Sequence, residues 1–226
     1  MHLHLLLDSA DPAAWAEWLP SGLFHGVTTN PTLLLRAARP CRLDELERLT
    51  REALDRGMQE IHLQAWGGDA EALAACGAGL AALAPGRVLV KLPITRAGAA
   101  AAHSLIAEGC PVTFTACYEP AQVLLAAALG ADYIAPYLGR ITDLGRDGHA
   151  ELTRMQRIVE GVARPVQAGA ALRLLVASLR SAEDLARLAA EGLDTFTISP
   201  AIAAELFAVE PTLAAADQFE LDALGI

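Results

Sequence analysis

The chain has 226 residues, of which 54% are hydrophobic, and its mean hydropathy is +0.34. Its formal charge is −10 at pH 7, and its basic residues are scattered, which argues against binding to nucleic acid or an anionic membrane. Four cysteines without CxxC spacing indicate neither disulfides nor a zinc site. We therefore expect a packed globular protein whose partner is a small molecule.

The N-terminal segment MHLHLLLDSADP lacks the basic region and small-residue cleavage site of a signal peptide. Farther along, Pro, Gly, Asn or a charged residue interrupts each long apolar stretch before it could span a membrane. These features predict a cytoplasmic protein with no membrane segment.

Short Leu-rich and β-branched runs alternate with longer segments of helical period. In chain order, the predicted strands are residues 3–8, 24–28, 60–65, 87–92, 111–115, 132–137, 172–178 and 195–199. The intervening helices begin at capping sites, namely Asp11-Pro12, Asn30-Pro31, Thr95, Glu119-Pro120, Ser181 and Ser199-Pro200.

Strict alternation of strands and helices, without a linker, indicates one parallel sheet. Eight strands in this length favour a closed (β/α)8 TIM barrel, a single domain over residues 1–226, rather than an open doubly wound sheet. Residues from about 208 to 226 predict a C-terminal helical extension that either covers the barrel or reaches a neighbouring subunit.

Lys91 is the only lysine among 17 basic residues, and it lies within the apolar run RVLVKLP. Loss of hydration disfavours an ammonium, so a lysine buried there has a lowered pKa and is a nucleophile. The alternative is a side chain that extends from the strand end to solvent.

Polar side chains end most of the other predicted strands, where barrel enzymes place their catalytic groups. They are Asp8, Thr28, Thr29, Asn30, Gln64, Thr115, Tyr137, Arg140, Ser178 and Arg180. Asp8 is not needed as a helix cap, because Asp11 supplies one, and it can bind a ligand hydroxyl or local backbone amides. Asn30 precedes a proline at a helix start, which is ordinary capping.

Ser178 and Arg180 follow the seventh strand and immediately precede a helix. A hydroxyl, a guanidinium and free helix amides at one point predict a phosphate site, with Arg140 as a further contact. The alternative for Arg180 is a surface arginine near a helix start.

His2 and His4 form an HxH pair, which at the end of a barrel strand would suggest a metal-dependent hydrolase. They begin the first strand instead, on the face of the barrel that contributes to stability. We therefore expect no catalytic metal.

Six motifs, LLLDSA, GVTTNPTLL, VLVKLP, FTACY, YIAPYLGR and VASLR, occur in an order that resembles the transaldolase family. The resemblance runs from Leu3 to about Arg180, and the short chain is similar to the compact subgroup of fructose-6-phosphate aldolases and small transaldolases. The compact members form rings of subunits, so the resemblance implies a homo-oligomer.

The resemblance implies Lys91 as the Schiff-base lysine, needing neither metal nor cofactor. Asp8 and Asn30, with the adjacent Thr29, would contact the hydroxyls of a sugar-phosphate donor. Ser178, Arg180 and Arg140 would bind its phosphate.

Gln64, Thr115 and Tyr137 would surround a catalytic water, where transaldolases have Glu, Thr and Phe. Gln and Tyr favour an aldolase that releases dihydroxyacetone from fructose 6-phosphate, whereas the loop GRITDLGRDG resembles the small transaldolases. A transaldolase is therefore the first alternative. A barrel that binds sugar phosphates without turnover is the second.

Overall fold

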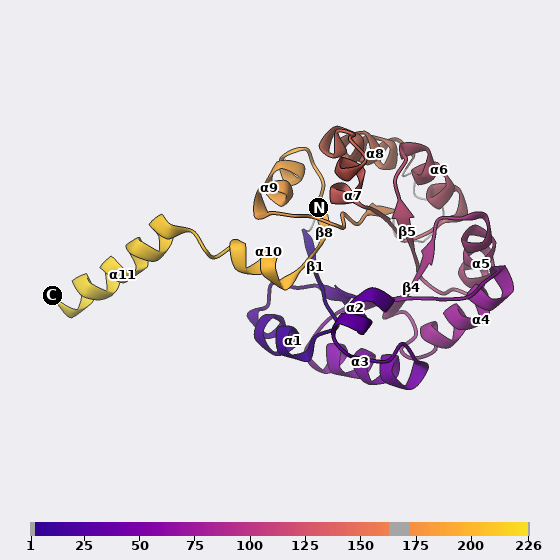
Figure 1. Ribbon diagram of the computed structural model, residues 1–226, viewed down its shortest axis with the longest axis horizontal. Helices are drawn as coiled ribbons and strands as arrows, with labels where there is room; N and C mark the ends of the chain where they lie inside the picture. The colour runs from indigo at the N-terminus through magenta and orange to yellow at the C-terminus, as the bar shows by residue number, and fades with distance from the viewer. Residues whose placement is uncertain (1–2, 163–171, 226) are drawn as a thin grey trace.

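The computed structural model describes residues 3–162 and 172–225 and consists of parallel strands surrounded by helices (Figure 1). The strands are β1 (His4–Asp8), β2 (Gly26–Thr28), β3 (Glu60–Gln64), β4 (Val88–Pro93), β5 (Val112–Cys117), β6 (Tyr133–Pro136), β7 (Arg173–Leu174) and β8 (Thr195–Ile198). Each strand pairs with its neighbour in the chain, β1 also pairs with β8, and a bridge from Val176 to Phe196 joins the last two. The sheet is therefore a closed (β/α)8 barrel, and the open doubly wound alternative is wrong.

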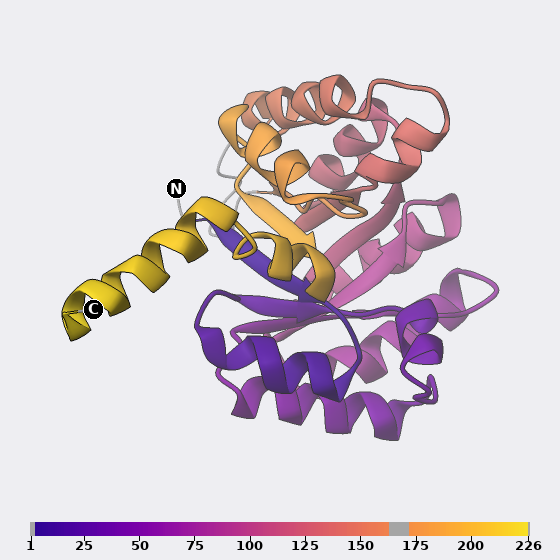
Figure 2. The same cartoon turned by 60° about the vertical axis from the view of Figure 1, so that its left-hand side comes forward.

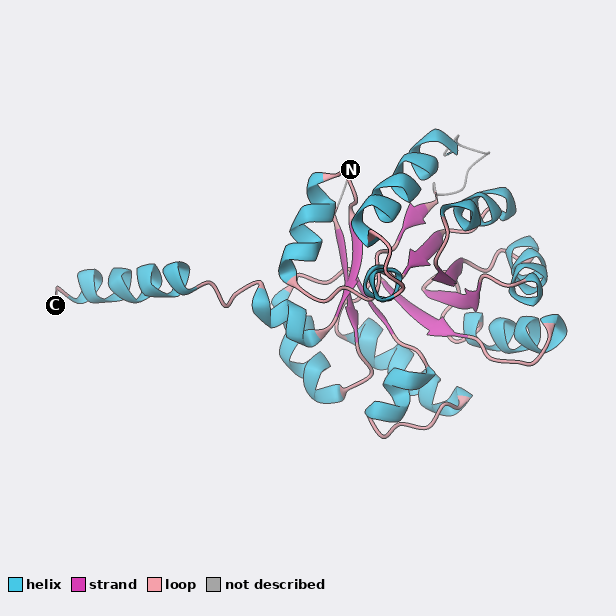
Figure 3. Ribbon diagram, turned by 45° about the horizontal axis from the view of Figure 1, so that its top comes forward, coloured by secondary structure: helices cyan, strands magenta, loops and turns pink. Residues whose placement is uncertain are grey.

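The helices lie outside the strands, as Figure 3 shows in cyan. They are α1 (Pro12–Trp18), α2 (Pro31–Arg36), α3 (Leu43–Asp55), α4 (Ala70–Ala81), α5 (Arg96–Ala107), α6 (Pro120–Leu129), α7 (Leu138–Asp143), α8 (Gly148–Val162), α9 (Ala182–Ala190), α10 (Pro200–Glu205) and α11 (Glu210–Leu224). The short helices α2 and α7 lie inward of the outer ring in the view of Figure 1, next to α3 and α8.

The predicted helix starts are confirmed by their hydrogen bonds. The side chains of Asp11, Asn30, Thr95, Ser181 and Ser199 each accept a bond from a backbone amide in the first turn. At α6, the Gln122 side chain accepts from the backbone N–H of Glu119. Each bond satisfies one of the amides that a helix N-terminus leaves without a partner.

Alternate residues of each strand face opposite sides of the barrel wall. Leu5 and Leu7 of β1 join the large apolar cluster between strands and helices, whereas Leu6 joins a smaller cluster inside the barrel. Asp8 is two residues beyond Leu6, and Lys91 of β4 is two residues beyond Leu89, which is also in the inner cluster. The same period of two therefore brings both polar side chains to the inside.

The seventh strand is shorter than predicted. Only Arg173 and Leu174 form a regular ladder, although residues 172–178 were expected to be extended. The chain beyond them still donates backbone hydrogen bonds to both neighbours, from Leu175 to Ile134 and from Val176 to Thr195. It then turns at Ser178, whose φ of 59° ends the extended conformation.

Helix α11 extends away from the barrel (Figures 1 and 2). None of its residues is buried, and Leu213, Phe219 and Leu224 are exposed apolar side chains. In the described part of the chain, no helix combines the length and apolar character needed to cross a membrane.

Gly98 allows α5 to begin close to the end of β4. A Cβ atom at this position would lie 1.9 Å from the carbonyl oxygen of Pro93. We predict that Gly98→Ala lowers the free energy of unfolding by about 1–3 kcal/mol, the usual cost of overpacking. Gly161→Ala is the matched control, because a Cβ at Gly161 of α8 meets no atom within 4 Å. Urea unfolding that shows equal effects for the two variants would contradict this prediction.

Candidate active site

A cavity of about 510 Å³ opens among the C-terminal ends of the strands. Eight of the side chains predicted from the sequence line it, namely Asp8, Asn30, Gln64, Lys91, Thr115, Tyr137, Arg140 and Ser178. Thr29 and Arg180 do not line it. Thr28, which is predicted from the sequence at a strand end without an assigned role, also lines the cavity. Arg36 and Thr197 line it as well and are not among the residues predicted from the sequence.

Lys91 is buried, with 7% of its surface exposed. Its Nζ donates a hydrogen bond of 2.8 Å to the backbone oxygen of Thr29. Burial lowers the pKa of Lys91 from its ordinary value, and the nearby Asp8 carboxylate opposes this shift. The side chain therefore does not extend to solvent, and its amine faces the cavity in an environment that favours the neutral, nucleophilic form.

Asp8 is oriented by two threonines from the neighbouring strands. The Thr28 hydroxyl donates to an Asp8 carboxylate oxygen at 2.6 Å, and it lies 2.6 Å from the Thr197 hydroxyl. In the ladders, Asp8 is paired with Thr28, and Thr197 is paired with Leu6. The alternating TFTI pattern of β8 carried the signal for Thr197, because it places both threonines on the inner face.

Gln64, Thr115 and Tyr137 form a connected polar group beside Lys91. The Thr115 hydroxyl donates to Gln64 Oε1 at 3.3 Å, and Gln64 Nε2 donates to the Lys91 backbone oxygen at 3.0 Å. The Tyr137 hydroxyl interacts with Thr115 and with the backbone of Ala116, although burial dominates and raises the pKa of Tyr137. The three side chains from β3, β5 and the end of β6 thus converge on one point.

Asn30 caps a helix and also lines the cavity. Its amide oxygen caps α2 by accepting from the Leu33 amide at 3.0 Å, as the ordinary reading of an Asn-Pro sequence suggested. Its side chain also lines the cavity, and within residues 3–162 and 172–225 its amide nitrogen has no hydrogen-bond acceptor. Arg36, at the other end of α2, adds a guanidinium to the cavity and has no ion pair with any described residue.

Ser178 and Arg180 meet the start of α7. The amides of Leu138 and Gly139 donate to the backbone oxygens of Ala177 and Ser178, at 3.0 and 2.9 Å. A Cβ at Gly139 would lie 2.6 Å from the Ser178 oxygen and from Arg180, so glycine permits this approach. Arg180 itself is paired with Asp143.

Arg140 stacks over the ring of Tyr137, with its guanidinium carbon 5.5 Å from the ring centre. It lines the cavity together with Ser178, and Arg180 lies immediately behind. The cavity therefore presents a guanidinium and a hydroxyl at the edge where an anionic group was predicted to bind.

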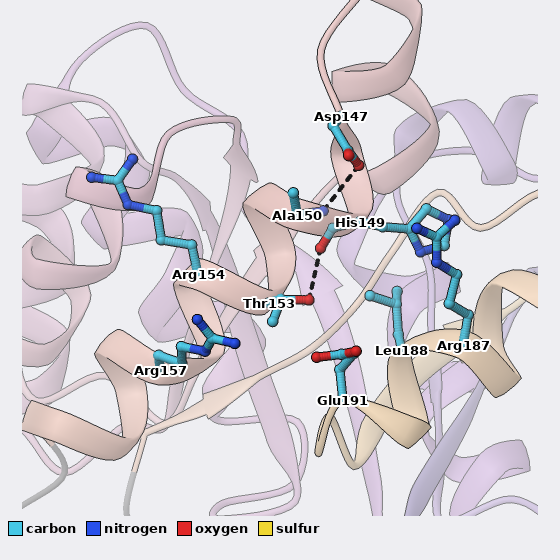
Figure 4. Close-up of a pocket in the computed structure, with 9 residues that line it drawn as sticks. All are labelled: Asp147, His149, Ala150, Thr153, Arg154, Arg157, Arg187, Leu188 and Glu191. Carbon is cyan, nitrogen blue, oxygen red and sulfur yellow. Dashed lines mark hydrogen bonds between the residues drawn. The ribbon is translucent and has the colours of Figure 1, made fainter.

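A second cavity, of about 270 Å³, lies between α8 and α9 on the outside of the barrel (Figure 4). Arg154, Arg157 and Arg187 line it together with Asp147 and Glu191. It contains no lysine and mixes cationic with anionic side chains. This composition gives it no nucleophile for carbonyl chemistry, so the cavity around Lys91 is the candidate active site.

The fold and this cavity define a (β/α)8 barrel with a buried lysine at the end of its fourth strand. A family model described as transaldolase/fructose-6-phosphate aldolase matches residues 5–224. The chain belongs to this family, whose members are Schiff-base aldolases and transferases, and it is an enzyme of that class.

Relatives are similar in sequence to this chain over nearly their whole length. A probable transaldolase of Caulobacter sp. (strain K31) is 34% identical over 223 residues, 99% of this chain and 97% of that protein. Another, of Rhodospirillum centenum, is 34% identical over 220 residues, 97% of this chain and 90% of that protein. The thiamine phosphate pyrophosphorylase of Pyrococcus furiosus superposes with a TM-score of 0.56 at 14% identity, over 87% of this chain and 85% of that one, which shows a shared fold alone.

The environment of Lys91 can be measured directly, because the chain has one lysine and isotope-labelled lysine therefore gives one NMR signal. We predict a pKa below the ordinary 10.5, because burial disfavours the ammonium. Asp8→Asn should lower the pKa further, since it removes a charge that stabilises the ammonium. In the urea-unfolded chain the pKa should return to the ordinary value. A folded-state pKa at or above 10.5 would contradict the burial described here.

Proposed function

We propose that this enzyme is a class I aldolase that acts on ketose phosphates, cleaving or forming the C3–C4 bond of fructose 6-phosphate. The products of cleavage are dihydroxyacetone and glyceraldehyde 3-phosphate. The observation that carries the proposal is that Tyr137, hydrogen-bonded to Thr115, lines the same cavity as Gln64 and the buried Lys91. A phenol at this point can deliver a proton to the bound three-carbon unit.

The reaction begins when the neutral Lys91 amine attacks the C2 carbonyl of the ketose. The carbinolamine loses water and becomes an iminium, which withdraws electrons from C3. The C3–C4 bond then breaks, its electron pair forms the enamine, and the proton of the C4 hydroxyl passes to a water held by Gln64, Thr115 and Tyr137. Glyceraldehyde 3-phosphate leaves first.

The enamine that remains on Lys91 has two fates. Protonation at C3, followed by hydrolysis of the iminium, releases dihydroxyacetone and restores the free amine. Capture by a second aldehyde instead transfers the three-carbon unit. General acid catalysis typically contributes 10²–10⁴-fold, so one positioned proton donor is enough to decide between the two.

Asp8 and Asn30 are assigned to the donor hydroxyls. Asp8 is held by the Thr28 hydroxyl and can accept from a substrate hydroxyl, whereas the Asn30 amide can donate. Thr29 acts through its backbone oxygen, which accepts the hydrogen bond from the Lys91 amine and orients it. Arg140 and Ser178 are assigned to the phosphate, with Arg180 behind them.

Transaldolase activity is the second candidate, supported by the relatives described as probable transaldolases. In that case the donor would be fructose 6-phosphate or sedoheptulose 7-phosphate and the acceptor erythrose 4-phosphate, as in the pentose phosphate pathway. The same Lys91 enamine serves both reactions, so product analysis distinguishes them.

We also propose that the enzyme is a homo-oligomer. Exposed apolar side chains on α11, including Leu213 and Phe219, are suited to contact a neighbouring subunit. Light scattering of the full chain would give the subunit number, and a monomeric mass would exclude this arrangement.

The first prediction from this mechanism concerns the covalent residue. Borohydride reduction in the presence of fructose 6-phosphate or dihydroxyacetone should add a three-carbon unit to Lys91, located by mass spectrometry. Lys91→Ala should lose turnover and labelling, whereas Arg187→Ala, a charge change outside the cavity, should keep both. An adduct elsewhere, or full turnover by Lys91→Ala, would exclude the Schiff base.

The second concerns the phosphate. In the synthetic direction, Arg140→Ala should lower kcat/KM for glyceraldehyde 3-phosphate more than for glyceraldehyde. The difference corresponds to about 1.5–3 kcal/mol of transition-state free energy, the range for charge-assisted hydrogen bonds. We expect Arg180→Ala to cause a similar selective loss for the phosphorylated aldehyde, and Ser178→Ala to cause a smaller one. Equal losses with both aldehydes would place the phosphate site elsewhere, and Arg187→Ala again serves as the control.

The third concerns the choice between release and transfer. Tyr137→Phe should reduce dihydroxyacetone release on the order of 10²-fold and reduce transfer to erythrose 4-phosphate less, because only release requires protonation of the enamine carbon C3. Tyr118→Phe is the matched control, since Tyr118 packs edge-on against Tyr137 at 5.8 Å. If wild-type enzyme forms glyceraldehyde 3-phosphate only when erythrose 4-phosphate is present, the enzyme is a transaldolase.

A further inference from the structure

The N-terminal end of the barrel, opposite the cavity, holds a cluster formed by His4, His25 and Glu60. One donor atom from each residue lies within 4.8 Å of the other two. His4 begins β1, His25 directly precedes β2 and Glu60 begins β3, so three adjacent strands contribute. His4 belongs to the HxH pair, which has no part in the proposed aldol chemistry, and His2 lies outside the described residues.

Glu60 is a largely buried carboxylate with several close contacts. Only 12% of its side chain is exposed. Its oxygens lie 3.0 Å from His62 Nε2, 3.3 Å from the Tyr133 hydroxyl and 3.7 Å from His25 Nε2. Although burial opposes ionisation, the hydrogen bonds from His25 and His62 keep the pKa of Glu60 well below its usual range. The His62 ring is itself fixed by the Thr113 hydroxyl at 2.9 Å, as expected of groups that orient a ligand.

His4 offers an unused nitrogen at the same place. Its Nδ1 is buried and has no hydrogen-bond partner. A neutral imidazole is the form of histidine that binds a metal ion. The His4 and His25 rings stack with centroids 3.9 Å apart, and a rotation of each ring about its Cβ–Cγ bond is needed to direct both nitrogens to one ion.

Charged groups of both signs surround the cluster. The Arg173 guanidinium donates to His4 Nε2 at 3.4 Å and is also paired with Asp194 at 3.0 Å. Metal binding through His4 Nδ1 therefore requires the imidazole proton to move to Nε2 and the contact with Arg173 to open. Asp132 lies near Glu60 and His62 and adds a further carboxyl group, whose pKa is raised by burial. Glu60 contacts two imidazoles and a phenol, and its carboxylate oxygens are the anionic ligand atoms of the cluster.

We propose that His4, His25 and Glu60 bind one divalent ion of the zinc class. Two imidazoles and a carboxylate are a common protein ligand set for zinc, and the fourth position would be open to solvent next to His25, whose side chain is 29% exposed. The ion would join the first three strands at the end of the barrel away from Lys91. Its role is therefore structural, and it is independent of the aldol reaction.

Co²⁺ is the probe, because a tetrahedral site gives visible ligand-field absorption. The chelator-treated full chain should bind one Co²⁺, and Zn²⁺ should displace this Co²⁺. The temperature midpoint of unfolding should rise with the free Zn²⁺ concentration. His25→Ala and His4→Ala should each weaken binding at least about tenfold. His103→Ala, which removes an exposed histidine on α5, is the matched control and should bind normally.

Circular dichroism and turnover without added metal check that each variant is folded. The proposal fails if Co²⁺ binding is not saturable, or if His25→Ala binds as tightly as wild type. It also fails if near-ultraviolet thiolate charge-transfer bands appear, because they would place the ion on cysteines such as Cys41 and Cys76. None of these outcomes bears on the Schiff-base mechanism, since the two sites are at opposite ends of the barrel.

Discussion

The burial of one amine inside the barrel is the constraint around which the rest of the cavity is arranged. A lysine without water favours its neutral form, but a fully isolated amine would be an unsatisfied polar group. The Thr29 backbone oxygen accepts a hydrogen bond from Lys91, and the Asp8 carboxylate limits the loss of charge. Thr28 and Thr197 hold that carboxylate in place. Reactivity thus depends on a balance between burial and one nearby charge.

Close backbone approach allows the loops above the barrel to complete the cavity. Gly98 lets α5 start against Pro93, and Gly139 lets α7 meet the chain at Ser178. Without these contacts, the side chains that follow β4 and β6 would stand farther from the amine. Packing outside the cavity therefore determines the geometry inside it, which is typical of sites built on rigid strand ends.

The barrel and the cavity-lining residues were largely predictable because both follow from periodicity. Strand alternation places Asp8 and Lys91 inside, and a parallel barrel gathers its strand ends. Contacts between distant segments were not predictable in the same way. The pairing of Arg180 with Asp143 and the contribution of Arg36 depend on how loops fold back. The two-residue length of β7 likewise reflects a local turn at Ser178 that apolar composition does not reveal.

The use of arginine for every other basic position has a practical consequence for chemical modification. On α3 and at its C-terminal cap, Arg48, Arg51 and Arg56 form the surface ion pairs that lysines often make. Reagents that target side-chain amines consequently find just one, at the centre of the barrel. Coupling a support or dye to the Lys91 amine would block the reaction with the ketose. Labelling through cysteine would leave this amine intact. An amine-directed reagent therefore has only one side chain to modify in this enzyme, and that side chain is buried.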